Sequence, residues 1–421
     1  MTTPRLPDKA LDELDRRLAP ADADLAARYP GDSGARQPVH TVYVPADRMA
    51  AGLPADWGAR ALTALAANAP TAAALAEATG LDPDLVGRVL PAVLAKLERE
   101  PVEDLRIDFE DGYGPRPPAE EDSHALGAAR ALAGALAGPA APPFAGLRIR
   151  SLEAATRRRG VRTLDLFLSA LLASTELPAG FVVTLPKVTD IRQVEAMALV
   201  CALVEEAHGL AGGRLRFELQ VETPQSILAA DGTAAVARMV QAAGGRCSGL
   251  HFGTYDYSAA LGIAAAYQSL EHPAADHAKA VMQVAVAGTG VRLSDGSTNL
   301  LPVGGTGAVH AAWRLHARLV RRSLERGFWQ GWDLHPAQLP TRYLATYAFF
   351  AEGLAAAAAR LRAYAEGAAG GVLDEPATAQ ALAGFLARGL GCGALTEAEV
   401  AERTGLDRAA VDRFARRSGR G

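Results

Sequence analysis

The chain has few cysteines, no long apolar run and little net charge, and each of these absences argues against a class of protein. Its 421 residues include only three cysteines, Cys201, Cys247 and Cys392, whose spacing fits neither a metal motif nor a disulfide framework. No apolar stretch free of glycine and charge reaches the roughly 18 residues of a membrane helix. The charged segment from Met1 to Pro20 does not have the pattern of a signal peptide. We therefore expect a cytoplasmic protein without a membrane partner.

The small net charge, −4, gives no reason to expect nucleic acid as a main partner. Hydrophobic residues make up 49% of the chain, so a sizeable core can form and global disorder is not expected. The length suits one large domain with appendages, or two domains.

The segment 216–224 carries the most informative pattern. Apolar and polar residues alternate along it, in the order Phe217, Glu218, Leu219, Gln220, Val221, Glu222. Because the side chains of a strand alternate between its two faces, one face of this strand is apolar and the other is ionised. Similar alternation occurs at 105–110 and 147–150. Such strands indicate a barrel whose outside packs on helices and whose inside does chemistry.

Strand-like runs alternate with Ala- and Leu-rich helical runs. The eight predicted strands lie near 41–45, 105–110, 146–150, 181–186, 216–222, 248–253, 290–294 and 330–334. This order predicts an α/β fold, a parallel (β/α)8 TIM barrel with extra N-terminal and C-terminal helices. The expected domains are a helical segment at 1–38, a barrel at 39–340 with a helical insertion near 58–100, and a C-terminal helical extension at 341–421. That extension is expected to form a lid or an oligomerisation element.

A short repeat occurs twice. Residues 76–82 (AEATGLD) match residues 401–407 (AERTGLD). Each copy predicts a short helix, a glycine stop and an aspartate cap for the next helix. A helix-turn-helix DNA reader has this shape, and so does a plain helical hairpin. Neither copy is strongly basic.

Acidic and basic residues gather at the C-terminal ends of the predicted strands, where active sites of such barrels lie. Arg106, Asp108 and Glu218 lie deeper and are expected to be used up by structural ion pairs. The residues nearer the rim are Glu110, Asp111, Arg148, Lys187, Glu222 and Asp256. Carboxylates on neighbouring strands suit Mg²⁺ or Mn²⁺ better than Zn²⁺, and Glu222 and Asp256 fit this best. The alternative is that both merely pair with arginines.

Seven motifs follow one another in a recognisable order over residues 41–340. They are Val44-Pro45, Asp108-Phe109-Glu110-Asp111, Arg148-Ile149, Leu185-Pro186-Lys187, Val221-Glu222-Thr223, Phe252-Gly253 with Asp256, and Asp333-Leu334-His335-Pro336-Ala337-Gln338. This set resembles the HpcH/HpaI aldolase and citrate lyase β-subunit superfamily, which also contains malate synthases. The sequence departs from that pattern at Arg150, where citrate lyase-like members usually have Asn, and at residues 112–114.

The resemblance implies a divalent metal, Mg²⁺ or Mn²⁺, held by Glu222 and Asp256. The metal would chelate a 2-oxo acid through its carboxylate and keto oxygen. Arg148 would stabilise the enolate oxygen that forms when a carbon–carbon bond is made or broken. Glu110 and Asp111 would orient metal-bound water or transfer protons. We assign the catalytic set to Arg148, Glu110, Asp111 and Lys187.

The resemblance also implies a substrate-binding set. Backbone amides around Gly253 and Thr254 would bind the substrate carboxylate, and Tyr255 is assigned to the same pocket. Arg150 adds positive charge, so a second substrate or a leaving group would be anionic.

The sequence therefore predicts a Mg²⁺-dependent carbon–carbon lyase or aldolase acting on a 2-oxo or 2-hydroxy acid through a metal-stabilised enolate. One alternative is a malate synthase-like acyl-CoA condensing enzyme or a thioesterase. An alternative of another class is a non-catalytic ligand-binding or regulatory protein that uses the repeated hairpins. Relatives in the superfamily are commonly trimers or hexamers, so the resemblance also implies a homo-oligomer.

Overall fold

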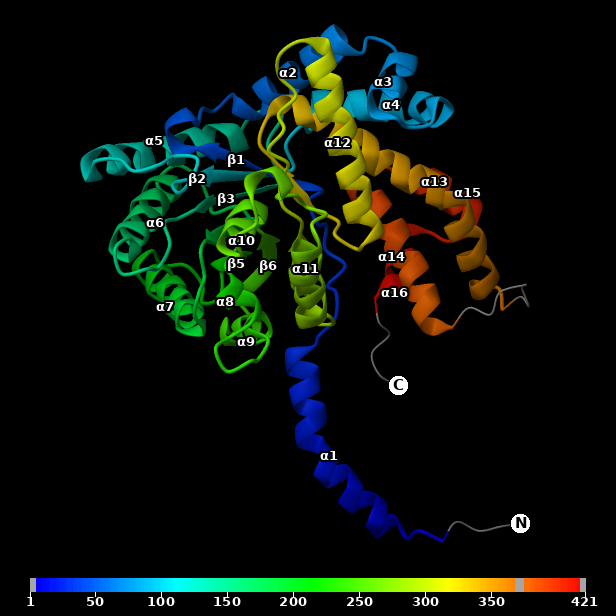
Figure 1. Ribbon diagram of the computed structural model, residues 1–421. Coiled ribbons are helices and arrows are strands. Elements are labelled where there is room, and N and C mark those ends of the chain that lie inside the picture. Colours follow the sequence, from blue (N-terminus) through cyan, green and yellow to red (C-terminus); the bar gives the residue numbers. More distant parts are fainter. Residues whose placement is uncertain (1–4, 368–374, 417–421) are drawn as a thin grey trace.

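The computed structural model describes residues 5–367 and 375–416. Its centre is a barrel of eight parallel strands surrounded by helices (Figure 1). The strands are β1 (His40–Pro45), β2 (Asp104–Asp108), β3 (Phe144–Arg148), β4 (Phe181–Leu185), β5 (Arg216–Val221), β6 (Cys247–Phe252), β7 (Arg292–Ser294) and β8 (Gly331–Asp333). Each of them begins and ends within two residues of a predicted strand.

The strands pair in the order β7-β6-β5-β4-β3-β2-β1-β8. The two ends of this series meet through a parallel bridge between Ser294 and Gln330, and the Asp295 amide donates to the Gln330 carbonyl at 2.8 Å. The barrel is therefore closed, and the predicted (β/α)8 fold class is confirmed.

Seven helices follow strands β2 to β8 in turn. They are α5 (Pro118–Leu136), α6 (Arg157–Leu172), α7 (Ile191–Ala207), α9 (Ala235–Ala242), α11 (Pro273–Val286), α12 (Thr306–Glu325) and α13 (Leu339–Ala365). Two shorter helices, α8 (Pro224–Ile227) and α10 (Thr254–Ala260), begin just after β5 and β6. The apolar face of each alternating strand packs outward against these helices: Leu105 and Ile107 of β2, for example, are fully buried. The polar faces consequently point into the barrel.

Helices α2 (Leu53–Asn68), α3 (Ala72–Thr79) and α4 (Pro83–Arg99) lie between β1 and β2. The C-terminal extension contains α14 (Pro376–Cys392), α15 (Glu397–Thr404) and α16 (Arg408–Ala415). Both α4 and α15 contact the long helix α13, and α14 contacts α13 and α16. The insertion and the extension thus pack on the same helix, α13, which follows the last strand of the barrel.

The two copies of the repeat form the predicted helix, glycine stop and capped helix. Gly80 and Gly405 both have left-handed backbones, with φ of 75° and 73°. The carboxylate of Asp82 accepts the Leu85 amide at 2.8 Å, and that of Asp407 accepts the Ala410 amide at 2.7 Å. Since their helices pack on other helices of the chain, both copies fit the description of structural hairpins.

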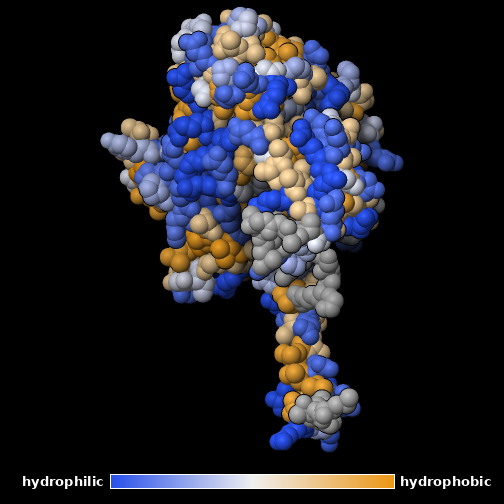
Figure 2. Space-filling view, turned by 90° about the vertical axis from the view of Figure 1, so that its right-hand side faces the viewer, coloured by the Kyte–Doolittle hydropathy of each residue, from blue (hydrophilic) through white to orange (hydrophobic). Residues whose placement is uncertain are grey.

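Helix α1 (Asp8–Arg28) projects from the body, and none of its residues is buried (Figure 1). Leu11, Leu14 and Leu18 are about half exposed, and Figure 2 shows apolar patches along this projection. No helix in the described ranges is long and apolar enough to cross a membrane.

Candidate active site

Four carboxylates gather around one ammonium group at the C-terminal rim of the barrel. The Nζ atom of Lys187, after β4, lies 3.1 Å from Glu110 Oε1 and 3.0 Å from Asp111 Oδ2, both after β2. It also lies 3.0 Å from Asp256 Oδ2, in the first turn of α10. Glu222, directly after β5, completes the cluster, which we call the rim cluster. The structure therefore brings together five of the predicted site residues from four strand ends.

The backbone at Lys187 is unusual. Its φ is 51°, the only positive φ of a non-glycine residue within the described ranges. The left-handed region is disfavoured for side chains larger than glycine, and such residues concentrate at functional sites. In this conformation the Lys187 amide donates to Glu222 Oε1 at 2.8 Å. The turn therefore directs both the amide and the ammonium group of Lys187 at the rim carboxylates.

Glu222 is almost completely buried, with 1% exposure. Its other oxygen, Oε2, accepts Gln220 Nε2 at 2.6 Å. A Cβ added at Gly253 would lie 2.5 Å from the Glu222 Cβ and 2.7 Å from Oε2. Glycine at the end of β6 is therefore needed for the Glu222 side chain to occupy this position.

Arg148 lies just below the rim cluster. Its Nε and one terminal nitrogen donate to the two oxygens of Asp108, both at 2.7 Å. The other terminal nitrogen donates to Gln220 Oε1 at 3.2 Å and lies 3.4 Å from Glu110 Oε2. The guanidinium also lies over the Tyr43 ring, 4.8 Å from its centroid. These contacts fix one edge of the guanidinium and direct the other edge towards the rim.

Sequence reasoning missed Gln220 and Tyr43 as parts of this site. Gln220 links Arg148 to Glu222, because its amide oxygen accepts from Arg148 and its amide nitrogen donates to Glu222. Its position, two residues before Glu222 on the same face of β5, is a period-two signal that was available. Tyr43 of β1 carried no comparable signal, because its neighbours are apolar.

The rim cluster holds more negative charge than its cations neutralise. Burial, reinforced by Asp111 and opposed by Arg148 and Lys187, raises the pKa of Glu110 to about 7. Burial also raises the pKa of Glu222 to about 8, although the nearby positive charge of Lys187 acts to lower it. The carboxylates raise the pKa of Lys187 in spite of its burial. An additional cation at the rim would stabilise the ionised form of both glutamates.

The groups in a second layer of charge, below Arg148, pair with one another. Arg106 donates to Asp104 at 2.8 Å and to Glu218 at 3.2 Å. His251 Nε2 lies 3.0 Å from Glu218 Oε2, the oxygen that also accepts Arg106. The prediction that Arg106 and Glu218 are used up by structural ion pairs is confirmed, and Asp108 is likewise paired, with Arg148.

Arg150 does not join the rim cluster. β3 ends at Arg148, two residues earlier than predicted, and the Arg150 guanidinium turns outward to α5. There it donates to Glu121 Oε2 at 2.7 Å and to the Gly114 carbonyl at 2.9 Å. The placement of Arg150 on the polar face of the third strand is therefore wrong, because the strand ends before this residue. The charge of Arg150 is neutralised by Glu121.

The predicted substrate-binding residues after β6 have different environments. The Gly253 amide already donates to the Val221 carbonyl at 2.9 Å. That the backbone amides around Gly253 and Thr254 bind a carboxylate stays a prediction. Thr254 is buried, and its hydroxyl has no hydrogen-bond partner among the described residues. The Tyr255 hydroxyl accepts the Asn299 amide at 2.7 Å and donates to the Ser297 carbonyl at 3.3 Å. Tyr255 thus anchors the loop after β7.

The donor set at the rim consists of oxygens. Among the described residues, neither Glu222 nor Asp256 forms an ion pair with an arginine. Asp256 pairs with the ammonium group of Lys187, and Glu222 accepts the Lys187 backbone amide. In the part of the chain that the structure describes, no three His, Cys, Asp or Glu side chains converge as a preformed metal site. Carboxylate oxygens are ligands that Mg²⁺ prefers, and it usually keeps several waters as its other ligands.

Several solved structures have a barrel similar to that of this chain. A citrate lyase from Burkholderia xenovorans LB400 is 21% identical and aligns over 74% of this chain and 91% of that chain, with a TM-score of 0.55. CitE from Mycobacterium tuberculosis, solved with magnesium, acetoacetate and coenzyme A, is 17% identical over 86% of this chain and 99% of that chain, with a TM-score of 0.50. An HpcH/HpaI aldolase/citrate lyase family protein from Burkholderia cenocepacia J2315 is more distant, with 14% identity, coverages of 75% and 93%, and a TM-score of 0.39.

The first two of these structures agree with the predicted barrel fold. Comparison with curated proteins gives no significant match. A family profile matches residues 18–419, which is nearly the whole chain. The chain therefore belongs to the family described as Domain of unknown function (DUF6986), and its barrel is similar in fold to that of a solved citrate lyase.

Proposed function

We propose that the protein is a Mg²⁺-dependent carbon–carbon lyase or aldolase that acts on a 2-oxo or 2-hydroxy acid. The observation that carries the proposal is the rim cluster, in which four carboxylates face one ammonium group beside a fixed arginine. Similar barrels occur in citrate lyases and aldolases, which supports an enzyme of this class.

The residues present fit a divalent cation. Glu110, Asp111, Glu222 and Asp256 carry four negative charges when ionised, Lys187 supplies one positive charge, and Arg148 is matched by Asp108. Held by Glu222 and Asp256, the cation would supply a Lewis acid for the carboxylate and keto oxygens of the substrate.

The chain's own groups would perform the remaining tasks. Arg148 offers the guanidinium edge not bound to Asp108 to a developing enolate oxygen, and the bidentate contact keeps it from reorienting. Glu110, with a pKa of about 7, can hold or release a proton at neutral pH, 3.4 Å from the same guanidinium. Lys187 keeps Glu110, Asp111 and Asp256 close to one another despite their like charge.

The test is calorimetric titration of pyruvate, oxaloacetate and glyoxylate, with and without Mg²⁺, on the wild type and Glu222→Gln. We expect Mg²⁺-dependent binding that Glu222→Gln abolishes, since this variant removes a charge but keeps the shape. Exchange of the pyruvate methyl protons with deuterium, followed by NMR, would report enolate formation without any second substrate. Glu325→Gln, in a surface ion pair with Arg321, is the matched control.

Two outcomes would contradict the proposal. Binding of no oxo acid under any condition would mean that the barrel serves another purpose. Equal binding by the wild type and Glu222→Gln would place the oxo acid away from the rim cluster. Catalysed exchange that depends on both Mg²⁺ and Glu222 would support the proposed chemistry over a non-catalytic ligand-binding protein.

A further inference from the structure

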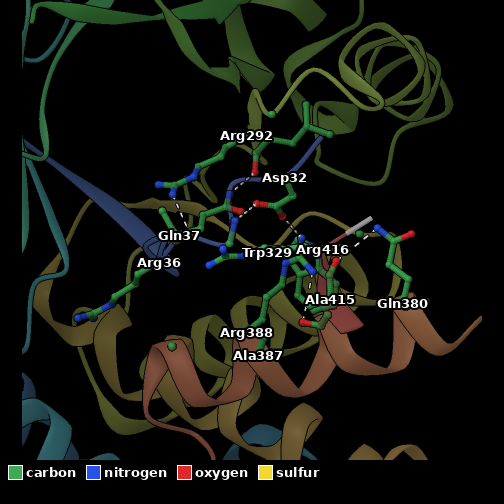
Figure 3. A pocket seen from close by; sticks show the side chains of 18 of the residues that line it. Asp32, Arg36, Gln37, Arg292, Trp329, Gln380, Ala387, Arg388, Ala415 and Arg416 are labelled. Carbon is green, nitrogen blue, oxygen red and sulfur yellow. Dashed lines mark hydrogen bonds and ion pairs between the residues drawn. The ribbon is translucent and has the colours of Figure 1, made fainter. Parts of the chain in front are cut away.

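A cavity lies at the opposite end of the barrel from the rim cluster. It has a volume of about 460 Å³ and is bounded by the segment that precedes β1, the starts of β7 and β8, and helices α14 and α16 (Figure 3). We call it the basal cavity. Cavities of this size hold small metabolites rather than single ions.

The basal cavity is lined by five arginines and one acidic residue. The arginines are Arg36, Arg292, Arg388, Arg408 and Arg416, and the acid is Asp32. Two of the arginines are neutralised by acids outside the lining. Arg36 pairs with Glu100 and Glu103 and points away from Arg388 and Arg416 in Figure 3. Arg408 pairs with Asp412 at 3.0 Å.

Of the remaining three arginines, Arg388 pairs with Asp32. One oxygen of Asp32 accepts Arg388 at 3.0 Å, and the other accepts the Gly34 amide. The Arg388 guanidinium also stacks over Trp329, 4.9 Å from the ring centroid. Arg388 is thereby held at the wall of the basal cavity, and Asp32 neutralises its charge.

Arg292 has a neutral partner. Its guanidinium donates to the Ala35 carbonyl at 2.9 Å, and no described carboxylate lies within ion-pair distance. Burial, helped by Arg216 and Arg388 and opposed by Asp32, lowers its pKa. Because a guanidinium does not deprotonate in proteins, the positive charge stays in the cavity.

Arg416 approaches the same cavity from the end of α16. A Cβ added at Gly34, whose φ is 72°, would lie 3.0 Å from Arg416 Nε, so the guanidinium rests directly on this loop. It has no ion-pair partner among the residues that the structure describes. Arg292 and Arg416 thus contribute two positive charges that the described carboxylates leave unpaired.

We propose that the basal cavity binds a small organic phosphate, with its phosphate group held by Arg292 and Arg416. A phosphate monoester carries nearly two negative charges at neutral pH, which matches the two unpaired guanidiniums. Guanidinium forks bind phosphate oxygens in pairs. The cavity has room beyond the phosphate, and its apolar lining, including Val286 and Phe350, suits an organic group.

This site differs from the rim cluster in position and charge, and the inference does not depend on the proposed lyase activity. The two proposed phosphate ligands come from β7 and from the residue after α16, with Arg388 of α14 and Asp32 of the N-terminal segment beside them. A bound phosphate would therefore connect the C-terminal helices to the base of the barrel. Binding should raise the thermal stability of the whole chain.

Calorimetry and thermal melting at low salt would test the proposal, with AMP as the organic phosphate, adenosine as its uncharged counterpart, and citrate as a carboxylate. We expect AMP to bind and to raise the melting temperature, and adenosine to do neither. Arg292→Gln and Arg416→Gln should each weaken AMP about tenfold or more, as expected for a lost charge-assisted contact. Because Arg416 is exposed, its substitution separates a binding defect from a folding defect.

Two matched variants localise the effect. Arg238→Gln, in an exposed ion pair with Asp231, should leave AMP affinity unchanged. Glu222→Gln should also leave it unchanged, because that residue lies at the other end of the barrel. Equal affinity of wild type, Arg292→Gln and Arg416→Gln would overturn the proposal. So would failure of AMP to bind at millimolar concentration, or binding of citrate alone.

Discussion

The two ends of the barrel carry unmatched charge of opposite sign. At the C-terminal rim, Glu110, Asp111 and Asp256 share the single ammonium group of Lys187. At the base, Arg292 has only a carbonyl partner and Arg416 has no described counter-charge. The net charge of −4 conceals this separation, because the two excesses largely cancel. A nearly neutral chain can therefore carry local excesses of opposite charge at the two ends of one barrel.

Buried charges between the two ends are matched. Asp333 is completely buried and accepts His40 Nδ1 at 2.8 Å, His316 Nε2 at 3.0 Å and two nitrogens of Arg342 at 3.0 Å. A buried charge without partners is strongly destabilising, so such networks are the usual arrangement in a protein interior. Unmatched charge at the two ends is consistent with ligands that supply the missing counter-charge.

The largest expected effect comes from breaking a matched network. Asp333→Asn keeps the shape but leaves the nearly buried Arg342 without its counter-ion, so we expect a loss of about 3–5 kcal/mol of stability. The urea concentration at the unfolding midpoint measures this loss. Asp231→Asn, in an exposed ion pair with Arg238, is the control and should cost less than about 1 kcal/mol. Similar losses in both variants would contradict the distinction between matched interior and solvent-exposed pairs.

The next effect concerns the unmatched rim. Arg148→Lys retains one charge but cannot donate to both oxygens of Asp108 while facing the rim. We expect Mg²⁺-dependent deuterium exchange of pyruvate to slow by about 10²–10³-fold, the usual cost of losing an oxyanion partner. Arg159→Lys in α6, which pairs with Glu121 and Asp122, provides the control. An unchanged exchange rate in Arg148→Lys would show that this guanidinium does not contact the reacting oxygen.

The sequence predicted the rim much better than the base. Short strand-like runs located the eight strands, with period-two alternation in three of them. The rule that barrel sites lie after the strands then placed Glu222 and Asp256 together. The error at Arg150 arose because strand ends are the least certain part of such a prediction, and a residue beyond the end of a strand no longer follows its alternation. The basal cavity was not predicted, because Arg292 and Arg416 come from distant parts of the chain and line one cavity only once the C-terminal helices have packed, which leaves no local pattern.

A smaller effect is expected from acid titration of a matched carboxylate on the flank of the barrel. Glu205 of α7 receives two hydrogen bonds from Arg246, at 2.7 and 2.8 Å, and these contacts lower its pKa to about 2. Because this lies below the unfolded value of about 4.3, the stabilisation is complete above that pH and is lost as pH falls towards 2.

Glu205→Gln should therefore cost about 2 kcal/mol at neutral pH and almost nothing near pH 2. Chemical unfolding at a series of pH values would measure the difference between variant and wild type. Glu325→Gln, in an exposed pair, should show little dependence on pH. A constant difference across the series would mean that packing, rather than charge, accounts for the role of Glu205.

The last effect concerns the space around Glu222 rather than its charge. Gly253→Ala would place a methyl group 2.5 Å from the Glu222 Cβ, so the glutamate must move. Since the substitution removes no donor, acceptor or charge, a loss of Mg²⁺-dependent pyruvate binding would have to follow from the displaced carboxylate. We expect about tenfold weaker binding, or about 1.4 kcal/mol, by calorimetry. Gly127→Ala in α5, where a Cβ meets nothing within 4 Å, is the matched control. Unchanged binding in Gly253→Ala would show that the position of Glu222 is not critical for the metal, and the rim would then act through its summed negative charge.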